Sequence, residues 1–239
     1  MVRGFIMQRK LGKVPLERVL SKFGIASRSQ TRKLIDQGHI SVDGKVIRDP
    51  GYLFVPEQAD IKINGKSVGR SAEHTIMLNK PKGYVTTKSD EKGRKTVYDL
   101  LPQELQHLHP VGRLDMATTG LLLMTTDTQL SNHLTDPVNA IPRTYIVTVE
   151  GKVDEAKVKL LLKGVMDDGE LLKPNNIILR KSSHRESHLT VELTEGKNRE
   201  IRRLFKAMGH EVTFLKRIAF GKFNLGDLLP GMHRKIYDL

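Results

Sequence analysis

The chain has 239 residues, 38% of them hydrophobic, which suits one large or two smaller globular domains. Its formal net charge of +13 favours a polyanionic partner, either nucleic acid or an anionic membrane surface. The absence of cysteine excludes disulfides and thiolate metal sites, and neither a spanning apolar run nor a secretory signal is evident. We therefore expect a cytoplasmic location and no membrane partner.

Positive charge is concentrated in the first third of the chain. Residues 1–73 hold 14 Lys and Arg against 7 Asp and Glu, whereas residues 74–239 hold 26 against 20. The polar stretch 69–73 (GRSAE) has the composition of a linker. These features predict two basic domains, a small one over 14–69 and a larger one over 74–239.

The small domain is predicted to combine two helices with two hairpins. Apolar residues at helical spacing predict a helix over 16–23. A second helix over 27–37 opens with an S-x-x-Q capping box. Asp43-Gly44 and Asn64-Gly65 each lie between alternating apolar residues, which predicts tight hairpin turns.

The larger domain is predicted to be rich in strands. Many strands interrupted by few helices indicate an α+β domain with a mixed, mostly antiparallel sheet. The predicted helices follow Asp127, cover 154–163 and cover 199–208. The predicted strands are 75–79, 83–88, 120–126, 144–151, 176–181, 188–193 and 211–220.

The sequence Arg113-Leu114-Asp115 precedes small hydroxyl residues, a glycine and an apolar strand. Alternating residues of an extended turn point to opposite sides, so Arg113 and Asp115 could share one face. For an isolated tripeptide, however, a capped turn with a surface ion pair is the commoner arrangement.

A second motif is an amphipathic cationic helix. Ile201, Leu204, Phe205 and Met208 form one face, which would pack on the core. The opposite face is either solvated or in contact with RNA phosphates. It carries Arg199, Arg202, Arg203 and Lys206, at i, i+3, i+4 and i+7.

Other site types are excluded by their spacing. Gly65-Lys66-Ser67 resembles the end of a phosphate loop, but residue 60 is Asp where that motif needs Gly. The histidines lack a metal-ligand pattern, and no dinucleotide loop or serine nucleophile elbow occurs. We therefore expect no metal site.

The motifs together resemble the bacterial ribosomal RNA pseudouridine synthases of the RsuA/RluB type, which join an N-terminal S4 RNA-binding domain to a catalytic domain. The resemblance spans nearly the whole chain and implies that α+β architecture. The matching segments are Ser27-Arg28, 37–44, 80–84, 109–125, Thr144-Tyr145, 196–205, Gly231 and Arg234.

The resemblance implies a reaction that breaks the bond between uracil N1 and the ribose, turns the base and rejoins it through C5, without cofactor or metal. Asp115 would be the catalytic carboxylate. Its chemical role, as attack on the ribose, attack on C6 or proton removal, stays open. Among the substrate-binding residues, Arg202 would pair with Asp115, Tyr145 would pack on the uracil and Ile201 would line the pocket. Arg113 would contact the RNA backbone or help turn the base out.

The RNA-binding residues expected in the S4-like domain and the cationic helix are Arg28, Arg32, Lys33, Lys45, Lys197, Arg199 and Arg203. The partner would be ribosomal RNA or an assembly intermediate, with the large-subunit (23S) RNA favoured over the small-subunit (16S) RNA, and the protein a monomer. One alternative is a non-catalytic RNA-binding ribosome assembly factor. A retaining glycosidase is less favoured, because that chemistry needs two carboxylates.

Overall fold

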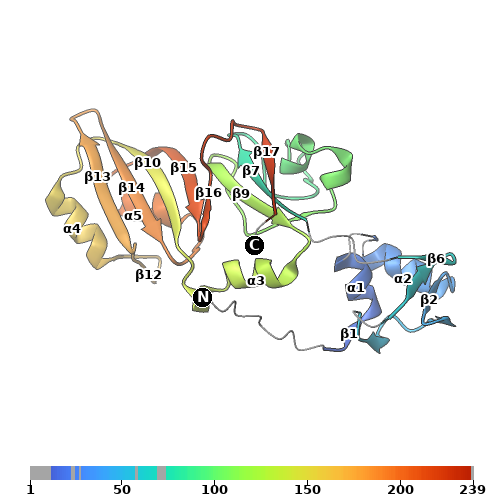
Figure 1. Cartoon of the computed structure of the whole chain (residues 1–239). Coiled ribbons are helices and arrows are strands. Elements are labelled where there is room, and N and C mark those ends of the chain that lie inside the picture. Colours follow the sequence, from blue (N-terminus) through green and yellow to red (C-terminus); the bar gives the residue numbers. More distant parts are fainter. Residues whose placement is uncertain (1–11, 23–24, 27, 57–58, 69–73, 238–239) are drawn as a thin grey trace, which may run out of the picture. The chain divides into compact units, whose positions relative to one another are not determined.

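The computed structural model describes residues 12–22, 25–26, 28–56, 59–68 and 74–237. The chain divides into two compact units, residues 1–73 and 74–239, each of which has its own core (Figure 1). The stretch 69–73 that we expected to be a linker lies outside the described residues. Within the described ranges, every helix is too short or too polar to cross a bilayer.

The N-terminal unit contains two helices, α1 (Leu16–Lys22) and α2 (Arg28–Asp36). The helices and the strands share one apolar core. Leu16 of α1, Ile35 of α2 and Ile40 at the start of the sheet are fully buried in it. The four-stranded sheet has the order β3 (Lys45–Val46), β2 (Ile40–Val42), β5 (Ile61–Ile63) and β6 (Lys66–Ser67). A separate pair joins β1 (Val14–Pro15) to β4 (Leu53–Phe54).

Both predicted hairpin turns are confirmed. Asp43-Gly44 joins β2 to β3 with φ angles of 50° and 80°, and Asn64-Gly65 joins β5 to β6 with 52° and 76°. Positive φ at both central residues is what a two-residue turn of this type requires, and Asn-Gly and Asp-Gly meet it at little cost. The capping box predicted at Ser27 lies outside the described residues.

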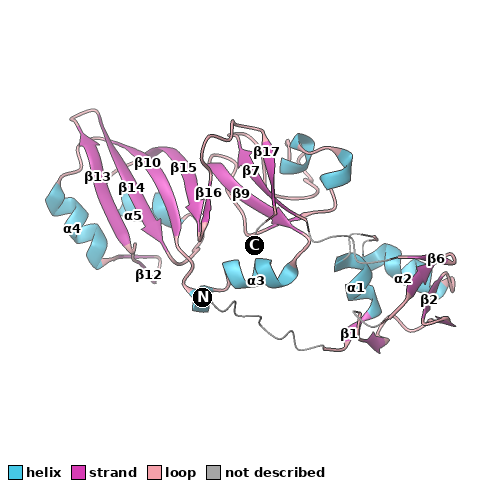
Figure 2. Cartoon of the chain, in the orientation of Figure 1, coloured by secondary structure: helices cyan, strands magenta, loops and turns pink. Residues whose placement is uncertain are grey.

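The C-terminal unit is built on one mixed sheet with the order β13-β14-β10-β15-β9-β7-β17 (Figure 2). The β15–β9 pair is parallel, and the other neighbours on this path are antiparallel. This confirms the predicted fold class. The strands are β7 (Thr75–Lys80), β9 (Thr119–Thr125), β10 (Arg143–Glu150), β13 (Asn176–Ser182), β14 (Glu186–Leu193), β15 (Val212–Phe220) and β17 (His233–Ile236). Two short strands lie off the path, β8 (His109–Pro110) on β9 and β16 (Phe223–Asn224) on β15.

Helices cover the two halves of the sheet differently. On the half formed by β13, β14, β10 and β15, α4 (Glu155–Lys163) and α5 (Glu200–Ala207) share one apolar core with the strands. In the other half, β9 is buried on both faces. Leu122 packs with the short helices η1 (Val97–Leu100) and η2 (Gln103–Leu105), and Leu121 packs toward α3 (Thr128–Thr135).

The predicted helix starts are confirmed by their caps. The carboxylate of Asp127 accepts hydrogen bonds from the Gln129 and Leu130 amides at the start of α3. Asp154 accepts one from the Lys157 amide at the start of α4. These contacts satisfy amides that have no partner within the helix.

The strand predicted over 83–88 is wrong. Gly83 turns the chain with a φ of 94°, and only Val85 makes a bridge, to Thr96. The hydroxyl of Thr86 bonds backbone atoms of Leu114 instead, so this segment forms a loop. The β-branched run Val85-Thr86-Thr87 favoured a strand, but the hydrogen-bond partners of this segment cannot be inferred from the local sequence.

Candidate active site

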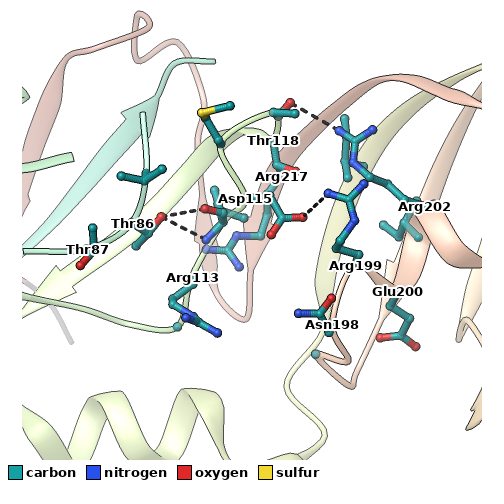
Figure 3. A pocket seen from close by; sticks show the side chains of 18 of the residues that line it. Thr86, Thr87, Arg113, Asp115, Thr118, Asn198, Arg199, Glu200, Arg202 and Arg217 are labelled. Carbon is teal, nitrogen blue, oxygen red and sulfur yellow. Dashed lines mark hydrogen bonds and ion pairs between the residues drawn. The ribbon is translucent and has the colours of Figure 1, made fainter. Parts of the chain in front are cut away.

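A cleft of about 980 Å³ lies in the C-terminal unit (Figure 3). Three segments line it: the loop 85–94, the turn 111–118 and the stretch 195–202 that leads into α5. Side chains of β10 and β15 also line it. The cleft therefore lies where segments distant in sequence converge around Asp115.

The turn that carries Asp115 is held by its backbone. Every carbonyl from Leu114 to Thr118 accepts a hydrogen bond. The Thr86 hydroxyl donates to the Leu114 carbonyl at 2.8 Å, and the Gly83 amide donates to the Met116 carbonyl at 2.9 Å. The Arg202 guanidinium donates to the Ala117 carbonyl at 3.5 Å. The Lys80 ammonium donates to the carbonyls of Asp115 (3.0 Å) and Thr118 (2.8 Å). Such a network fixes the position of the carboxylate before substrate arrives.

Lys80 is fully buried at the end of β7. Its ammonium also donates to the Pro81 carbonyl at 3.3 Å, which makes three carbonyl partners in all. Burial lowers the pKa of Lys80 to about 8, although the charge of Asp115 acts in the opposite direction. Our sequence interpretation gave Lys80 no role in the site. The available signal was a lysine that ends an otherwise apolar strand.

Gly120 lets two strands of the sheet approach closely. Its φ is 101°, and a Cβ added there would lie 2.2 Å from the carbonyl oxygen of Arg217 on β15. Only glycine fits both the backbone angle and the contact. The parallel pairing of β9 with β15 beside the Asp115 turn therefore depends on this residue.

The carboxylate of Asp115 pairs with Arg199 rather than with Arg202. Arg199 Nη1 lies 3.7 Å from Asp115 Oδ2, with the side chains 51% and 41% exposed. The expected pair with Arg202 is wrong in this structure, because the Arg202 guanidinium donates to the carbonyls of Val212 (2.8 Å) and Ala117. Burial and nearby Arg199 lower the pKa of Arg202, while Asp115 raises it. Arg202 therefore interacts electrostatically with the Asp115 carboxylate without pairing with it.

Arg199 has a left-handed backbone conformation, with a φ of 48°, immediately before α5. This conformation is costly for a residue with a side chain, and such residues concentrate at functional sites. Here it stands at the point where the chain turns from the cleft into the helix, on the residue that pairs with Asp115.

The remaining substrate-binding candidates also line the cleft. Tyr145 on β10 and Ile201 on α5 are buried, and Arg113 is exposed two residues before Asp115. The structure thus brings Arg113, Asp115, Tyr145, Ile201 and Arg202 into one cleft, from three separate parts of the sequence.

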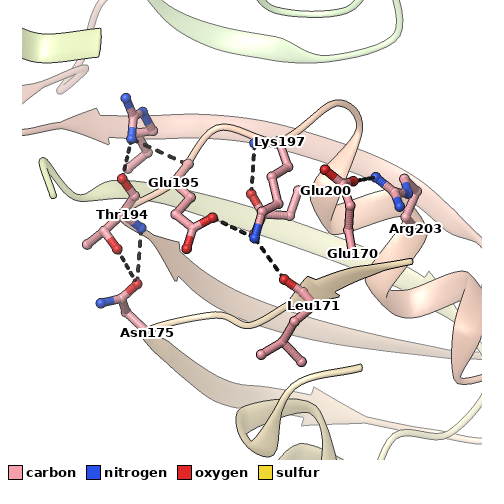
Figure 4. Close-up of polar contacts among 9 residues, drawn as sticks. Glu170, Leu171, Asn175, Thr194, Glu195, Lys197, Glu200 and Arg203 are labelled. Atoms are coloured by element: carbon pink, nitrogen blue, oxygen red, sulfur yellow. Dashed lines mark hydrogen bonds and ion pairs between the residues drawn. The ribbon is translucent and has the colours of Figure 1, made fainter. Parts of the chain in front are cut away.

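Lys197 and Arg203 contact a β-hairpin that the sequence did not reveal (Figure 4). The hairpin joins β11 (Val165–Asp167) to β12 (Glu170–Leu172). Arg203 donates to the carboxylates of Asp167 and Glu170. Lys197 donates to the Leu171 carbonyl at 2.8 Å and pairs with Glu195. Lys197 and Arg203 therefore bind the hairpin, whereas Arg199 pairs with Asp115 in the cleft.

The loop 85–94 forms the opposite wall. The guanidinium of Arg94 donates to both carboxylate oxygens of Asp90, and the amides of Lys92 and Arg94 donate to the same carboxylate. The Arg94 contacts lower the pKa of Asp90 to about 2. This network fixes the loop in its turn and holds Asp90 ionised.

Two buried arginines and one buried glutamate near the cleft were given no role in the site by the sequence. Arg143 and Arg217 are 7% and 3% exposed, and Glu200 is 4% exposed. Burial raises the pKa of Glu200. The sequence did carry a signal for Arg217, which has the same inward phase as Leu215 on β15. Among the described residues, no group of three His, Asp or Glu side chains could hold a metal ion.

The cations expected to bind RNA in the N-terminal unit are only partly free. Arg32 donates to the Glu17 carboxylate on α1 at 2.6 Å, but its side chain remains 61% exposed. Lys33 and Lys45 are exposed. The side chain of Arg28 lies outside the described part of the chain.

Known proteins are similar to this chain in sequence over most of its length. A relative in Aquifex aeolicus (strain VF5), named an uncharacterized RNA pseudouridine synthase, is 37% identical over 224 residues, 93% of this chain and 90% of its own. Ribosomal large subunit pseudouridine synthase B of Bacillus subtilis (strain 168) is 35% identical, over 92% and 91%. The protein of that name in Escherichia coli (strain K12) is 40% identical, over 90% and 76%.

A solved structure of a pseudouridylate synthase superposes with a TM-score of 0.65 at 28% identity, and the match covers 94% of this chain and 96% of that one. Residues 74–207 match the family model described as RNA pseudouridylate synthase, and residues 14–60 match the S4 domain. The family expected from the sequence is confirmed. This chain belongs to the RNA pseudouridylate synthases and carries an S4 domain at its N-terminal end.

Proposed function

We propose that this enzyme converts a specific uridine of large-subunit (23S) ribosomal RNA to pseudouridine, with Asp115 as the catalytic carboxylate and without a cofactor. The relatives named ribosomal large subunit pseudouridine synthase B support the choice of RNA. Ribosomal RNA, free or within an assembly particle, is the proposed partner. A monomeric state and a cytoplasmic location remain predictions.

One observation carries the assignment of Asp115: its carboxylate projects into the cleft from a turn whose carbonyls are all hydrogen-bonded. Tyr145 and Ile201 supply apolar surface in the same cleft, and Arg199 supplies a positive charge at 3.7 Å. The guanidinium gives the carboxylate a charged partner in the cleft, and nucleophilic attack or proton removal both use a carboxylate oxygen.

Charge around the cleft suits a nucleotide turned out of an RNA loop. Arg113 and Arg199 are exposed, and we assign them to the RNA backbone. Phosphate contacts and packing on Tyr145 would offset the few kcal/mol that base extrusion costs. Lys197 and Arg203 already contact the β11–β12 hairpin, so we assign them to anchoring the start of α5.

The S4 domain would act as a tether for the RNA. Lys33 on α2 and Lys45 on β3 are exposed cations, and Arg32 is largely exposed beside Glu17. Contacts of this kind with phosphates position a protein without reading sequence. Affinity would then come from both units, whereas the choice of uridine would depend on the catalytic domain.

The test compares the wild-type enzyme with Asp115→Asn on 23S and 16S transcripts and on immature ribosomal particles, with every pseudouridine mapped. We expect one modified position in 23S RNA with wild type and none with Asp115→Asn, at RNA affinities within about threefold. Asp227→Asn is the matched control, because Asp227 is an exposed carboxylate paired with Arg234 away from the cleft.

Three outcomes would contradict parts of the proposal. Turnover by Asp115→Asn would remove Asp115 from its role. Modification of 16S RNA alone would overturn the choice of subunit. Tight binding by wild type without pseudouridine in any of these RNAs would favour the non-catalytic assembly factor.

A further inference from the structure

Arg217 lies where the two halves of the central sheet meet. On β15 it stands opposite Tyr145 of β10 on one side and beside Gly120 of β9 on the other. It lines the cleft but is only 3% exposed. Figure 3 draws it with Asp115 among the residues that line the cleft. Its guanidinium therefore belongs to the interior of the site rather than to the rim.

The hydrogen bonds of Arg217 are incomplete. Its Nε donates to the Leu121 carbonyl at 2.8 Å, and its guanidinium stacks on the Phe220 ring at 4.8 Å. Its Nη2 has no acceptor among the described residues. A buried donor without a partner costs free energy, and more when it is charged, so it calls for an explanation.

The neighbouring Arg143 provides an internal comparison. It stacks on the same Phe220 ring, at 4.9 Å. In contrast to Arg217, it donates to four carbonyls, those of Leu134, Ile141, Thr194 and Glu195. A purely structural arginine in this setting can thus be satisfied by backbone, which Arg217 is not.

No carboxylate in the described part of the chain forms an ion pair with either of these arginines. Three of the carboxylates that line the cleft already have cationic partners, Asp90 with Arg94, Asp115 with Arg199 and Glu195 with Lys197. Glu200 is a buried carboxylate of the cleft without such an ion pair to a described residue, and its charge interacts with that of Arg143. The inner end of the cleft therefore keeps an excess of buried positive charge, suited to a group that carries or develops negative charge.

The burial of Arg217 determines which part of the RNA substrate it can contact. Phosphates are bulky and hydrated and suit the exposed cations at the rim, whereas a planar base can pack on the buried apolar residues of the cleft, Tyr145 and Ile201. Arg217 is the register partner of Tyr145 across the β10–β15 pair, and both residues line the cleft. Resting on the proposed function, we propose that Arg217 binds the target base, its free Nη2 group donating a hydrogen bond to uracil O2 or O4 and stabilising the negative charge of the detached ring.

That charge follows from the bonds that change. When the N1–C1′ bond breaks, its electron pair leaves with the ring and is delocalised onto O2 and O4. Asp115 compensates the electron-poor sugar by attack on the ribose or by removing a ribose proton. The turned ring then bonds to C1′ through C5 as the Asp115 carboxylate leaves C1′ or as the abstracted proton returns to the ribose. C5 finally loses its proton and N1 gains one. Atoms and electrons balance without an external reactant.

The test is a cycle between the protein and the substrate, measured as single-turnover rates on an RNA hairpin that contains the target uridine. Wild type and Arg217→Met are each assayed with uridine, 2-thiouridine and 4-thiouridine at that position, because sulfur accepts hydrogen bonds weakly. We expect Arg217→Met to lower the rate on uridine about 10²-fold, with RNA affinity within about threefold. One thio substitution should slow wild type and cause little further loss in the variant.

Arg180→Met is the matched control, a strand arginine that does not line the cleft, and it should leave rates unchanged. If Arg217→Met does not fold, Arg217→Lys carries the same cycle with its positive charge retained. The Arg217 assignment would be overturned, with the proposed function intact, if Arg217→Met turned over at the wild-type rate. It would also be overturned if, for both thio substrates, the rate loss from Arg217→Met simply added to the loss from sulfur. A wild type that forms no pseudouridine would overturn it together with the proposed function.

Discussion

Replacing Lys80 by Met tests whether the hydrogen bonds from the Lys80 ammonium are needed to hold the Asp115 turn in place. The substitution keeps a long unbranched side chain but removes an ammonium that donates to three carbonyls. Asp115 keeps a second donor, the Thr118 amide, whereas the carbonyls of Thr118 and Pro81 lose the Lys80 donor. The Asp115 turn should therefore become mobile while the core around β7 stays packed.

Two opposing contributions set the change in unfolding free energy. The two carbonyls that lose a charged donor, one buried (Thr118) and one partly buried (Pro81), cost up to about 3 kcal/mol each. Lowering the pKa of Lys80 from 10.5 to about 8 corresponds to about 3 kcal/mol of desolvation that Met does not suffer. The net change in stability is thus at most about 3 kcal/mol. A misplaced carboxylate, in contrast, should cost about 10²-fold in rate.

The assays are urea unfolding and single-turnover kinetics, with the exposed neighbour Lys82→Met as control. Between pH 8 and 10.5 the unfolded chain keeps a proton that folded Lys80 has lost. Wild-type stability should therefore rise with pH relative to Lys80→Met, by up to about 3 kcal/mol. A variant with the wild-type rate, or no difference in this pH dependence, would refute the reasoning.

Three further variants probe other contacts. Gly120→Ala should cost at least about 3 kcal/mol in thermal unfolding, because its Cβ meets a carbonyl of β15, whereas Gly83→Ala, at a similar φ but with free space, should cost about 1–2 kcal/mol; equal losses would contradict this. Arg203→Leu should slow turnover severalfold and slightly lower the thermal unfolding temperature, as it frees the β11–β12 hairpin; an unchanged rate would argue against anchoring. Neutralising Lys33 and Lys45 together should reduce the slope of log affinity against log salt by about two, and an unchanged slope would remove them from the RNA contact.

Local sequence signals accounted for much of the scaffold. Asp-Gly and Asn-Gly specified hairpin turns through the positive φ they tolerate, and Asp127 and Asp154 specified helix starts through the amides they cap. Segments rich in apolar and β-branched residues identified most of the central strands. It failed at 83–88, where the partner of Thr86 is Leu114, nearly thirty residues away.

The sequence by itself determined the fold class, the family and the turn on which Asp115 stands, since these depend on short-range periodicity and on a contiguous signature. Only the tertiary structure decided that Arg199 rather than Arg202 pairs with the carboxylate, that Lys80 supports the turn and that Arg217 lies beside Tyr145. Each of these contacts joins strands or loops remote in sequence. Their distances depend on sheet register and strand crossing, which no local pattern of residue types encodes.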